Sequence, residues 1–298
     1  MTRSLTRQAL AGLVFAALAA PALAATPINE TRPLDARGEV EVSNLKGSIE
    51  VRTWDRNEVR VTGSLGEGVE RLEIDGSGRK LGVRVRYPRS SHDTGPTRLV
   101  LEIPHQASLD VESVAANVDV QGVAGEELGI DSVSGTVVAV GAPRKAAIES
   151  VSGDLRLNLN TRDVEVDSVS GKVSLRGRIS GSVEVETVSG DIDVDTRGER
   201  LSRLQLSTVS GDASVQGGIG DGARFSLESV SGDLRLALLS GSSARVEATT
   251  FSGDIEAPGA NVVRKRYGPG ASLEHSYGNG NASIAVETFS GDVRLVID

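Results

Sequence analysis

The sequence Ser150-Val151-Ser152-Gly153-Asp154 decides the fold, because the same phrase recurs from the middle of the chain to its end. Each copy has Ser or Thr, then Val or Phe, then Ser-Gly. The copies are marked by eight glycines, Gly135, Gly153, Gly171, Gly190, Gly211, Gly232, Gly253 and Gly291. Successive glycines are 18, 18, 19, 21, 21, 21 and 38 residues apart, and the last gap is about two periods. A regular period near 20 residues predicts a solenoid of stacked coils.

Apolar and polar residues alternate on both sides of each glycine. Val164-Glu165-Val166-Asp167 precedes one glycine, and Leu155-Arg156-Leu157-Asn158-Leu159 follows another. Alternation with period two predicts strand, and no stretch of 26–298 has the apolar spacing of an amphipathic helix. We therefore predict an all-β fold, a single-stranded β-helix or solenoid with about 18–21 residues per coil. Right-handed winding is favoured because parallel crossovers are overwhelmingly right-handed.

The composition of the phrase is typical of a sharp corner between two strands. Glycine reaches φ > 0 without steric cost, and serine bonds its hydroxyl to nearby backbone. Stacked corners lie roughly 4.8 Å apart, so we expect a ladder in which each serine hydroxyl serves the next. Val166, Val173, Leu175 and Val185 are expected to point inward, where each buried aliphatic side chain contributes roughly 1.5–3 kcal/mol.

Aspartate follows the glycine in six copies, whereas Thr136 and Lys172 take its place in the other two. Carboxylates stacked at roughly 4.8 Å repel one another. We interpret the row as a solvated acidic edge. A weak divalent-cation site along the same row is the alternative.

Residues 1–24 have the features of a secretory signal peptide. Arg3 and Arg7 precede an apolar stretch, and Ala22-Leu23-Ala24 is a small-residue cleavage site. We expect an exported protein, in the periplasm or outside the cell at its surface. The chain has no cysteine, so neither lipid attachment at the cleavage site nor disulfides are expected.

The charge and composition exclude several classes of partner. The formal net charge is −9, which disfavours binding to nucleic acid and to anionic membranes. No second hydrophobic span follows the signal, so membrane insertion is not expected. Aromatic residues make up only 3% of the chain, as suits a thin interior without room for large rings.

We divide the remaining chain into three parts. Residues 25–38 are expected to be an extended lead-in, and 39–108 an N-terminal β region that caps the open end of the solenoid. Residues 109–298 are expected to form the regular solenoid, with a projecting hairpin and an atypical terminal coil at 257–284 that act as a cap. Asn279-Gly280 supplies the hairpin signal within that segment.

The sequence shows no recognisable arrangement of catalytic residues. His92, His105 and His275 are far apart in sequence, and the serines belong to corners. The gaps between glycines leave no loop long enough to wall a catalytic cleft. We therefore predict no enzyme, no catalytic or metal residues and no cofactor.

Two surfaces are candidates for interaction. One is the basic and aromatic part of the projection, made of Arg264, Lys265, Arg266, Tyr267 and Tyr277. The other is a flat sheet face of the solenoid, which offers a binding surface along its length.

The repeated Thr/Ser-Val-Ser-Gly-Asp phrase resembles a bacterial family, the putative-adhesin domain known as domain of unknown function 4097. The resemblance includes the Ile103-Pro104 strand end and the Tyr277-Gly278-Asn279-Gly280 turn, and covers roughly residues 40–298. It implies a single-stranded β-helix on an exported protein with an adhesive role, and it supplies no catalytic residues.

We expect a non-enzymatic envelope protein that binds another envelope protein or a surface glycan. An envelope-stress sensor or scaffold in the periplasm is the alternative, followed by a carbohydrate-active enzyme.

Overall fold

The computed structural model describes residues 26–90, 93–264 and 269–297, and within these ranges the chain forms strands and no helix. The predicted signal peptide 1–24 lies outside the described residues. The described part of the chain contains no helix with the length and apolar character of a membrane span. The strands are β1 (Thr26–Trp54), β2 (Glu58–Leu65), β3 (Arg71–Arg86), β4 (Thr97–Pro104), β5 (Ser108–Val123), β6 (Glu127–Ser134), β7 (Val137–Gly141), β8 (Lys145–Ser152), β9 (Leu155–Leu159), β10 (Thr161–Ser170), β11 (Val173–Arg176), β12 (Ile179–Ser189), β13 (Ile192–Ser210), β14 (Ala213–Ser231), β15 (Leu234–Leu238), β16 (Ala244–Ser252), β17 (Ile255–Glu256), β18 (Val263–Arg264), β19 (Ala271–Tyr277), β20 (Ala282–Ser290) and β21 (Val293–Ile297).

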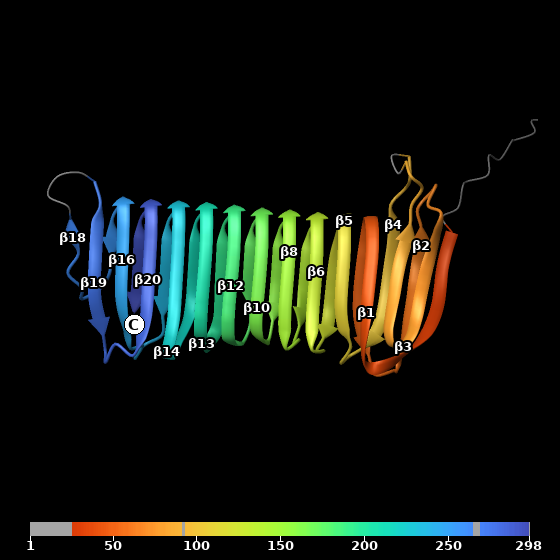
Figure 1. Cartoon of the computed structure of the whole chain (residues 1–298), viewed down its shortest axis with the longest axis horizontal. Helices are drawn as coiled ribbons and strands as arrows, with labels where there is room; N and C mark the ends of the chain where they lie inside the picture. The colour runs from red at the N-terminus through yellow and green to blue at the C-terminus, as the bar shows by residue number, and fades with distance from the viewer. Residues whose placement is uncertain (1–25, 91–92, 265–268, 298) are drawn as a thin grey trace, which may run out of the picture.

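Each coil has a leading strand, which runs into the glycine corner, and a trailing strand, which leaves it. Leading strands pair in parallel with leading strands, as β10 does with β8 and β12. Trailing strands pair in the same way, as β11 does with β9 and β13. The arrowheads of the leading strands line up along the upper edge of Figure 1, where the corner lies. The two rows of strands form a leading sheet and a trailing sheet, and the predicted all-β solenoid is confirmed.

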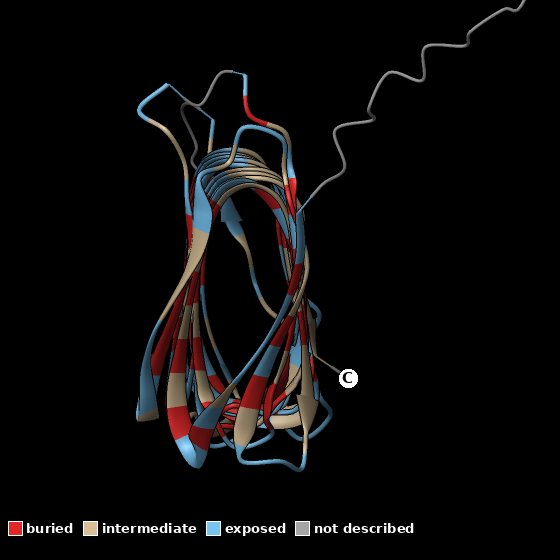
Figure 2. Cartoon of the chain, turned by 90° about the vertical axis from the view of Figure 1, so that its right-hand side faces the viewer, coloured by how far each residue is buried: buried red, intermediate tan, exposed pale blue. Residues whose placement is uncertain are grey.

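The interior is an aliphatic column between the two sheets. Buried and exposed residues alternate along each strand, as the view along the axis shows (Figure 2). Val166, Val173, Leu175 and Val185 are fully buried, as their alternation with polar neighbours predicts. Because one coil buries only a few side chains, each coil depends on its neighbours for stability.

The N-terminal part of the chain adds a first coil and covers the end of the stack. Within β1, Gly47 forms a corner, and the strand pairs in parallel with β5 across it. Residues 26–33, expected to be an extended lead-in, instead pair antiparallel with β2. Since β2 also pairs antiparallel with β4, the stack ends in strands of the opposite direction.

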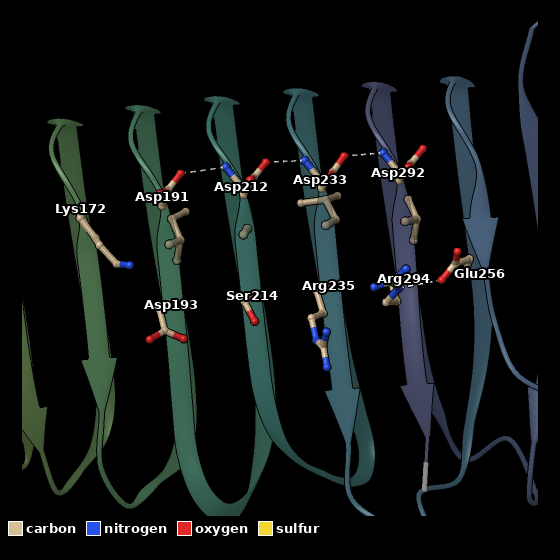
Figure 3. A pocket seen from close by; sticks show the side chains of 14 residues that line it. Lys172, Asp191, Asp193, Asp212, Ser214, Asp233, Arg235, Glu256, Asp292 and Arg294 are labelled. Carbon is tan, nitrogen blue, oxygen red and sulfur yellow. Dashed lines mark hydrogen bonds and ion pairs between the residues drawn. The ribbon is translucent and has the colours of Figure 1, made fainter.

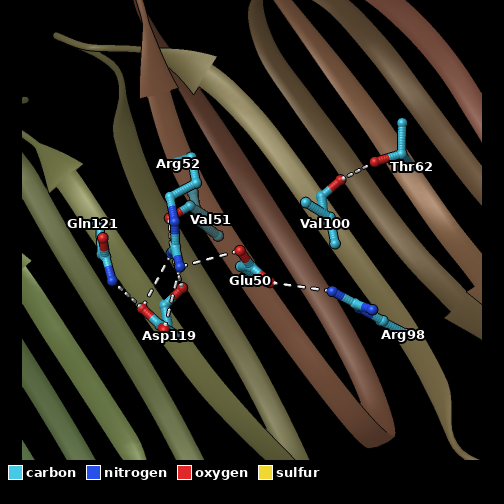
Figure 4. A network of polar contacts seen from close by, with 8 residues as sticks. All are labelled: Glu50, Val51, Arg52, Thr62, Arg98, Val100, Asp119 and Gln121. Atoms are coloured by element: carbon cyan, nitrogen blue, oxygen red, sulfur yellow. Dashed lines mark hydrogen bonds and ion pairs between the residues drawn. The ribbon is translucent and has the colours of Figure 1, made fainter.

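A polar network holds this first coil to its neighbours on the trailing sheet (Figure 4). The Arg52 guanidinium lies 3.1 Å from carboxylate oxygens of both Glu50 and Asp119. The amide of Gln121 donates to Asp119 at 3.1 Å, and Arg98 of β4 approaches Glu50 at 3.6 Å. These side chains are partly exposed, so they fix the register of the first coils more than they add stability.

The C-terminal strands are interleaved with earlier ones. β20 pairs in parallel with both β14 and β16, so it lies between them (Figure 1). β21 pairs with both β15 and β17. The Gly291 coil therefore lies between those of Gly232 and Gly253, although its corner is the last in the sequence.

The segment 257–284 explains how the chain reaches this position. After β17 it runs to the end of the stack, where β19 pairs antiparallel with the outer edge of β16 and with the short β18. The Asn279-Gly280 turn then passes Ser243, whose hydroxyl accepts a hydrogen bond from the Asn279 amide at 2.8 Å. The expected Asn-Gly hairpin is absent from the described pairings, since β19 and β20 lie on opposite sides of β16.

Candidate binding surface

The eight predicted corner glycines form one column. Their φ angles lie between +115° and +154°, a region that side chains disfavour. A Cβ on Gly190 would lie 2.1 Å from the carbonyl oxygen of Gly171, and Gly291 has the same relation to Gly232. Glycine is thus required for its φ angle and also for the close approach of the next coil.

The two hydroxyl residues of each phrase have different roles. The first is buried, and Ser113 and Ser132 bond to each other there at 3.2 Å. The second donates to the preceding coil, as Ser152 does to the Val133 carbonyl at 3.2 Å and Ser170 to the Val151 carbonyl at 3.2 Å. The expected ladder between hydroxyls is therefore replaced, at the second position, by bonds from hydroxyl to backbone.

Five of the six carboxylates that follow a corner glycine accept a backbone hydrogen bond from the next coil. The Asp233 amide donates to Asp212 at 2.9 Å, and the Asp292 amide donates to Asp233 at 2.8 Å (Figure 3). The side-chain oxygen of Asn117 accepts the equivalent hydrogen bond from the Thr136 amide at 3.0 Å. The need for an acceptor for the backbone amide of the next coil therefore explains why Asp or Asn follows the corner. Within the described residues, no group of three or more acidic or histidine side chains is arranged to hold a metal.

An exposed line of apolar side chains runs along the column, one from each of nine successive coils. We call it the apolar ridge, and its members are between 43% and 58% exposed. Phe251 and Phe289 stack at its C-terminal end, with ring centroids 4.8 Å apart and planes 6° apart. In spatial order the ridge consists of Val114, Val133, Val151, Val169, Val188, Val209, Val230, Phe289 and Phe251.

A row of carboxylates lies beside the ridge on the leading sheet, two residues before each ridge position. Five successive coils supply an acid here, and their backbones are in register. We call it the leading acidic row, made of Glu112, Asp131, Glu149, Asp167 and Glu186. No ion pair within 4 Å is described for these five residues.

The environment of two row carboxylates, Asp131 and Asp167, disfavours their charged form. Burial, followed by the neighbouring Glu149 carboxylate, raises the pKa of Asp131 above its usual value. Burial raises the pKa of Asp167 in the same way, with the carboxylates of Glu186 and Glu165 adding to the effect. The row is therefore a line of like charges, and none of its members has an ion pair among the described residues.

Ridge and row together line a shallow groove of about 560 Å³ on the leading sheet. Valines from Val133 to Val209 form its apolar side, and Asp131, Glu149, Asp167 and Glu186 form its acidic side. The groove spans five coils, and four of them contribute one valine and one carboxylate each, because it is built from the repeat itself.

A second groove, of about 430 Å³, lies on the trailing sheet (Figure 3). It begins at the carboxylates after the corner glycines and is lined further down by charges of both signs. Arg294 pairs there with Glu256 at 2.7 Å. Acids and bases thus offset one another inside this groove, unlike the groove on the leading sheet.

The basic and aromatic patch predicted in 257–284 is not gathered into one described site. Arg264 pairs with Asp254 at 2.9 Å. The Tyr277 hydroxyl donates to the Pro258 carbonyl at 2.9 Å, and its ring meets His275 edge-on at 4.6 Å. Both residues thus hold the cap together, whereas Lys265, Arg266 and Tyr267 lie outside the described residues.

Sequence reasoning missed the ridge, although its signal is present in every copy of the phrase. In Ile148-Glu149-Ser150-Val151, the apolar Ile148 and the hydroxyl of Ser150 share the inward face. The alternation therefore places Val151 outward, beside Glu149. An apolar residue at the same outward position in each copy is the pattern that indicates a ridge.

The fold and its repeated corner define a β-solenoid whose apolar ridge runs along its length. A model of the Toastrack DUF4097 family matches residues 36–296, so the chain belongs to this family. The family expected from the repeated phrase is confirmed.

Three solved structures are also similar to the chain. They are a putative adhesin from Bacteroides fragilis (8% identity, TM-score 0.47, 91% of this chain and 97% of that one), a putative cell adhesion protein from Clostridium sporogenes (10%, 0.24, 92% and 100%) and a putative adhesin from Parabacteroides merdae (9%, 0.27, 91% and 96%). A search of curated proteins finds no match.

Proposed function

We propose that this protein is a non-enzymatic binding scaffold of the cell envelope, which holds a partner lengthwise along the apolar ridge. The observation that carries the proposal is the unbroken line of nine half-exposed apolar side chains, one per coil. Single exposed valines are ordinary, but a contiguous apolar line on a surface is typical of an interaction site.

The preference of β-branched residues for strands is the competing explanation for the valines. It does not account for Phe251 and Phe289, which continue the line with a larger exposed apolar area. It also predicts that threonine would serve equally well, since threonine has the same branching. That difference provides the test.

Several features favour binding over catalysis. Both grooves are open, and the one on the leading sheet is built from repeated valines and carboxylates without a unique point at which reactive groups converge. Among the described hydrogen bonds, none joins a histidine to a corner serine. The location in the envelope rests on the signal peptide expected at 1–24.

The proposal is tested with a ridge variant, Val151→Thr/Val169→Thr/Val188→Thr, which keeps the β-branched shape and removes the apolar surface. The matched control is Val140→Thr, at a valine 39% exposed on the trailing sheet. Labelled full-length protein is titrated against isolated envelopes of its own cells. We expect the ridge variant to bind at least about tenfold more weakly, which corresponds to about 1.4 kcal/mol, and the control to bind as the parent does.

Equal binding by parent and ridge variant contradicts the proposed surface. Turnover of acidic polysaccharides by the purified protein contradicts the non-enzymatic part of the proposal. Recovery of the protein in the cytoplasmic fraction contradicts its place in the envelope.

A further inference from the structure

The apolar ridge lies between two lines of carboxylates. The leading acidic row flanks its N-terminal half, and the aspartates after the corner glycines flank its C-terminal half, at Asp191, Asp212, Asp233, Asp292 and Asp254. From this arrangement we infer that the partner of the ridge is a basic amphipathic helix, bound lengthwise in the groove of the leading sheet. The inference rests on the proposed function and names the chemical class of its partner.

Charge complementarity favours a cationic partner over a second copy of the chain. Two ridges placed face to face would bring one acidic flank against another, with a formal net charge of −9 on each chain. Like charges at an interface suppress association. A partner whose apolar stripe is bordered by Lys and Arg places a cation opposite each acidic flank.

The leading acidic row provides the strongest attraction. Its five carboxylates have no described ion pair, and neighbours such as Glu149 and Asp131 already repel each other. A cationic side chain beside the row relieves this repulsion as well as making its own contact. Lys145 lies 3.9 Å from Glu165, outside the row.

The spacing of the ridge selects a helix over an extended chain. Ridge residues repeat about every 4.8 Å along the axis, the distance between neighbouring strands. The apolar stripe of a helix repeats about every 5.2 Å, from 3.5 residues at about 1.5 Å each. Side chains on one face of a strand repeat about every 6.7 Å.

These differences accumulate along the groove. Over the four intervals from Val133 to Val209, a helix slips by about 2 Å, whereas a strand slips by about 8 Å, more than one coil. A helix of about 13 residues therefore keeps an apolar side chain near every ridge valine in the groove. An extended strand can place an apolar side chain near only one or two of the ridge valines.

The test uses two 18-residue peptides of leucine and lysine with identical composition. One has the apolar spacing of a helix, and the other alternates strictly, as a strand does. Binding to the full-length protein is measured by fluorescence anisotropy at 50 mM and 500 mM NaCl. We expect the helical peptide to bind at least about tenfold more tightly than the alternating one, and to lose affinity at the higher salt.

Variants identify the surface. The ridge variant and a row variant, Glu149→Gln/Asp167→Asn/Glu186→Gln, are each expected to weaken the helical peptide at least about tenfold. Val140→Thr is expected to leave it unchanged. Circular dichroism and thermal melting verify the fold of each variant, and the single substitution Val169→Thr, expected to weaken binding about threefold, replaces any triple variant that does not fold.

Other outcomes overturn the inference. Equal or tighter binding of the alternating peptide indicates an extended partner. Self-association in sedimentation that the ridge variant abolishes indicates a second copy, and binding to phosphatidylglycerol vesicles without binding to the helical peptide indicates a membrane surface. If the helical peptide fails while the ridge variant still loses envelope binding, the proposed function stands and the helical partner is wrong. If both fail, the proposed function is wrong as well.

Discussion

The corner glycines could be predicted residue by residue, because only glycine combines a positive φ with a recurrent sharp bend. The role of the aspartates that follow these glycines could not be predicted. Sequence shows that they recur and that they repel one another, but not that the Asp233 amide needs the Asp212 carboxylate as an acceptor. That need arises only when one coil is placed on the next.

Replacement of Gly190 by alanine tests the close approach of neighbouring coils. Its Cβ would meet the Gly171 carbonyl oxygen at 2.1 Å in addition to the strain of φ +147°. We expect Gly190→Ala to lower the free energy of unfolding by more than about 3 kcal/mol, measured by urea unfolding followed by circular dichroism.

Gly241→Ala is the control, since Gly241 has φ +77° but open space around its Cβ. It is expected to cost about 1–2 kcal/mol, from the backbone conformation alone. Equal losses at the two positions would show that contact between coils plays no part.

Substitutions at Asp212 separate its acceptor role from its charge. Asp212→Asn keeps an oxygen for the Asp233 amide and removes repulsion within the row, so we expect stability to be unchanged or higher. Asp212→Ala leaves that amide without its acceptor and is expected to cost about 1 kcal/mol. Asn117 already occupies the equivalent place before Thr136. Thermal unfolding of the two variants distinguishes the acceptor role from the charge. A destabilised Asn variant would show that the charge itself is needed.

The strands were predicted well, because alternation assigns each side chain to a face. The apolar ridge was not predicted. A flat sheet face of the solenoid was one candidate surface and the basic and aromatic residues of 257–284 were the other, but the valines of the repeated phrase were interpreted only as part of a corner. Tyr277 and Arg264 illustrate the error, since each is engaged inside the cap. An exposed basic and aromatic cluster in sequence is not evidence that its members meet in space.

The leading acidic row predicts how the stability of its strands depends on pH. The pKa values of Asp131 and Asp167 are raised in the folded protein, so the folded state binds protons more readily than the unfolded state does. Stability therefore rises as the pH falls through these raised values, and the gain is complete below the unfolded carboxyl pKa of about 3.9.

The row variant isolates this effect from carboxylates elsewhere, such as Glu41, whose pKa is lowered chiefly by its hydrogen bond with Lys80. Between pH 7 and pH 4 we expect the melting temperature of the parent to rise by about 1–4 °C relative to that of the row variant. Parallel melting curves across this range would show that the row does not repel itself.

The number of coils and their stacking follow from the repeat, but their order in space does not. Gly232 and Gly253 are 21 residues apart, like the pairs before them, and nothing in that spacing shows that another layer separates them. Only the pairing of β20 with both β14 and β16 places Gly291 between them.

Two deletions of similar size test this order. Removing 172–190 takes out one internal coil and joins Gly171 to Asp191, so the remaining coils stack as before. Removing 282–298 takes out β20 and β21 and leaves β16 without its inner neighbour. We expect the internal deletion to keep amide protection from hydrogen exchange in 244–256, and the terminal deletion to lower it there at least about tenfold, which corresponds to about 1.4 kcal/mol of local opening. Protection that survives the terminal deletion would show that β16 does not depend on the last strands.

The interleaved last layer also has a consequence for how the molecule is made. A growing polypeptide can stack its strands in chain order only as far as β15, because the next leading strand in space, β20, follows β16 in the chain. Until then β16, which has the same phrase and the same pairing edge, meets a vacant site on β14 that belongs to β20. We therefore expect that, during synthesis, β16 can pair directly with β14, which gives a stack with one layer fewer than the native one. Residues 282–298 can then take their native place only by displacing this pairing.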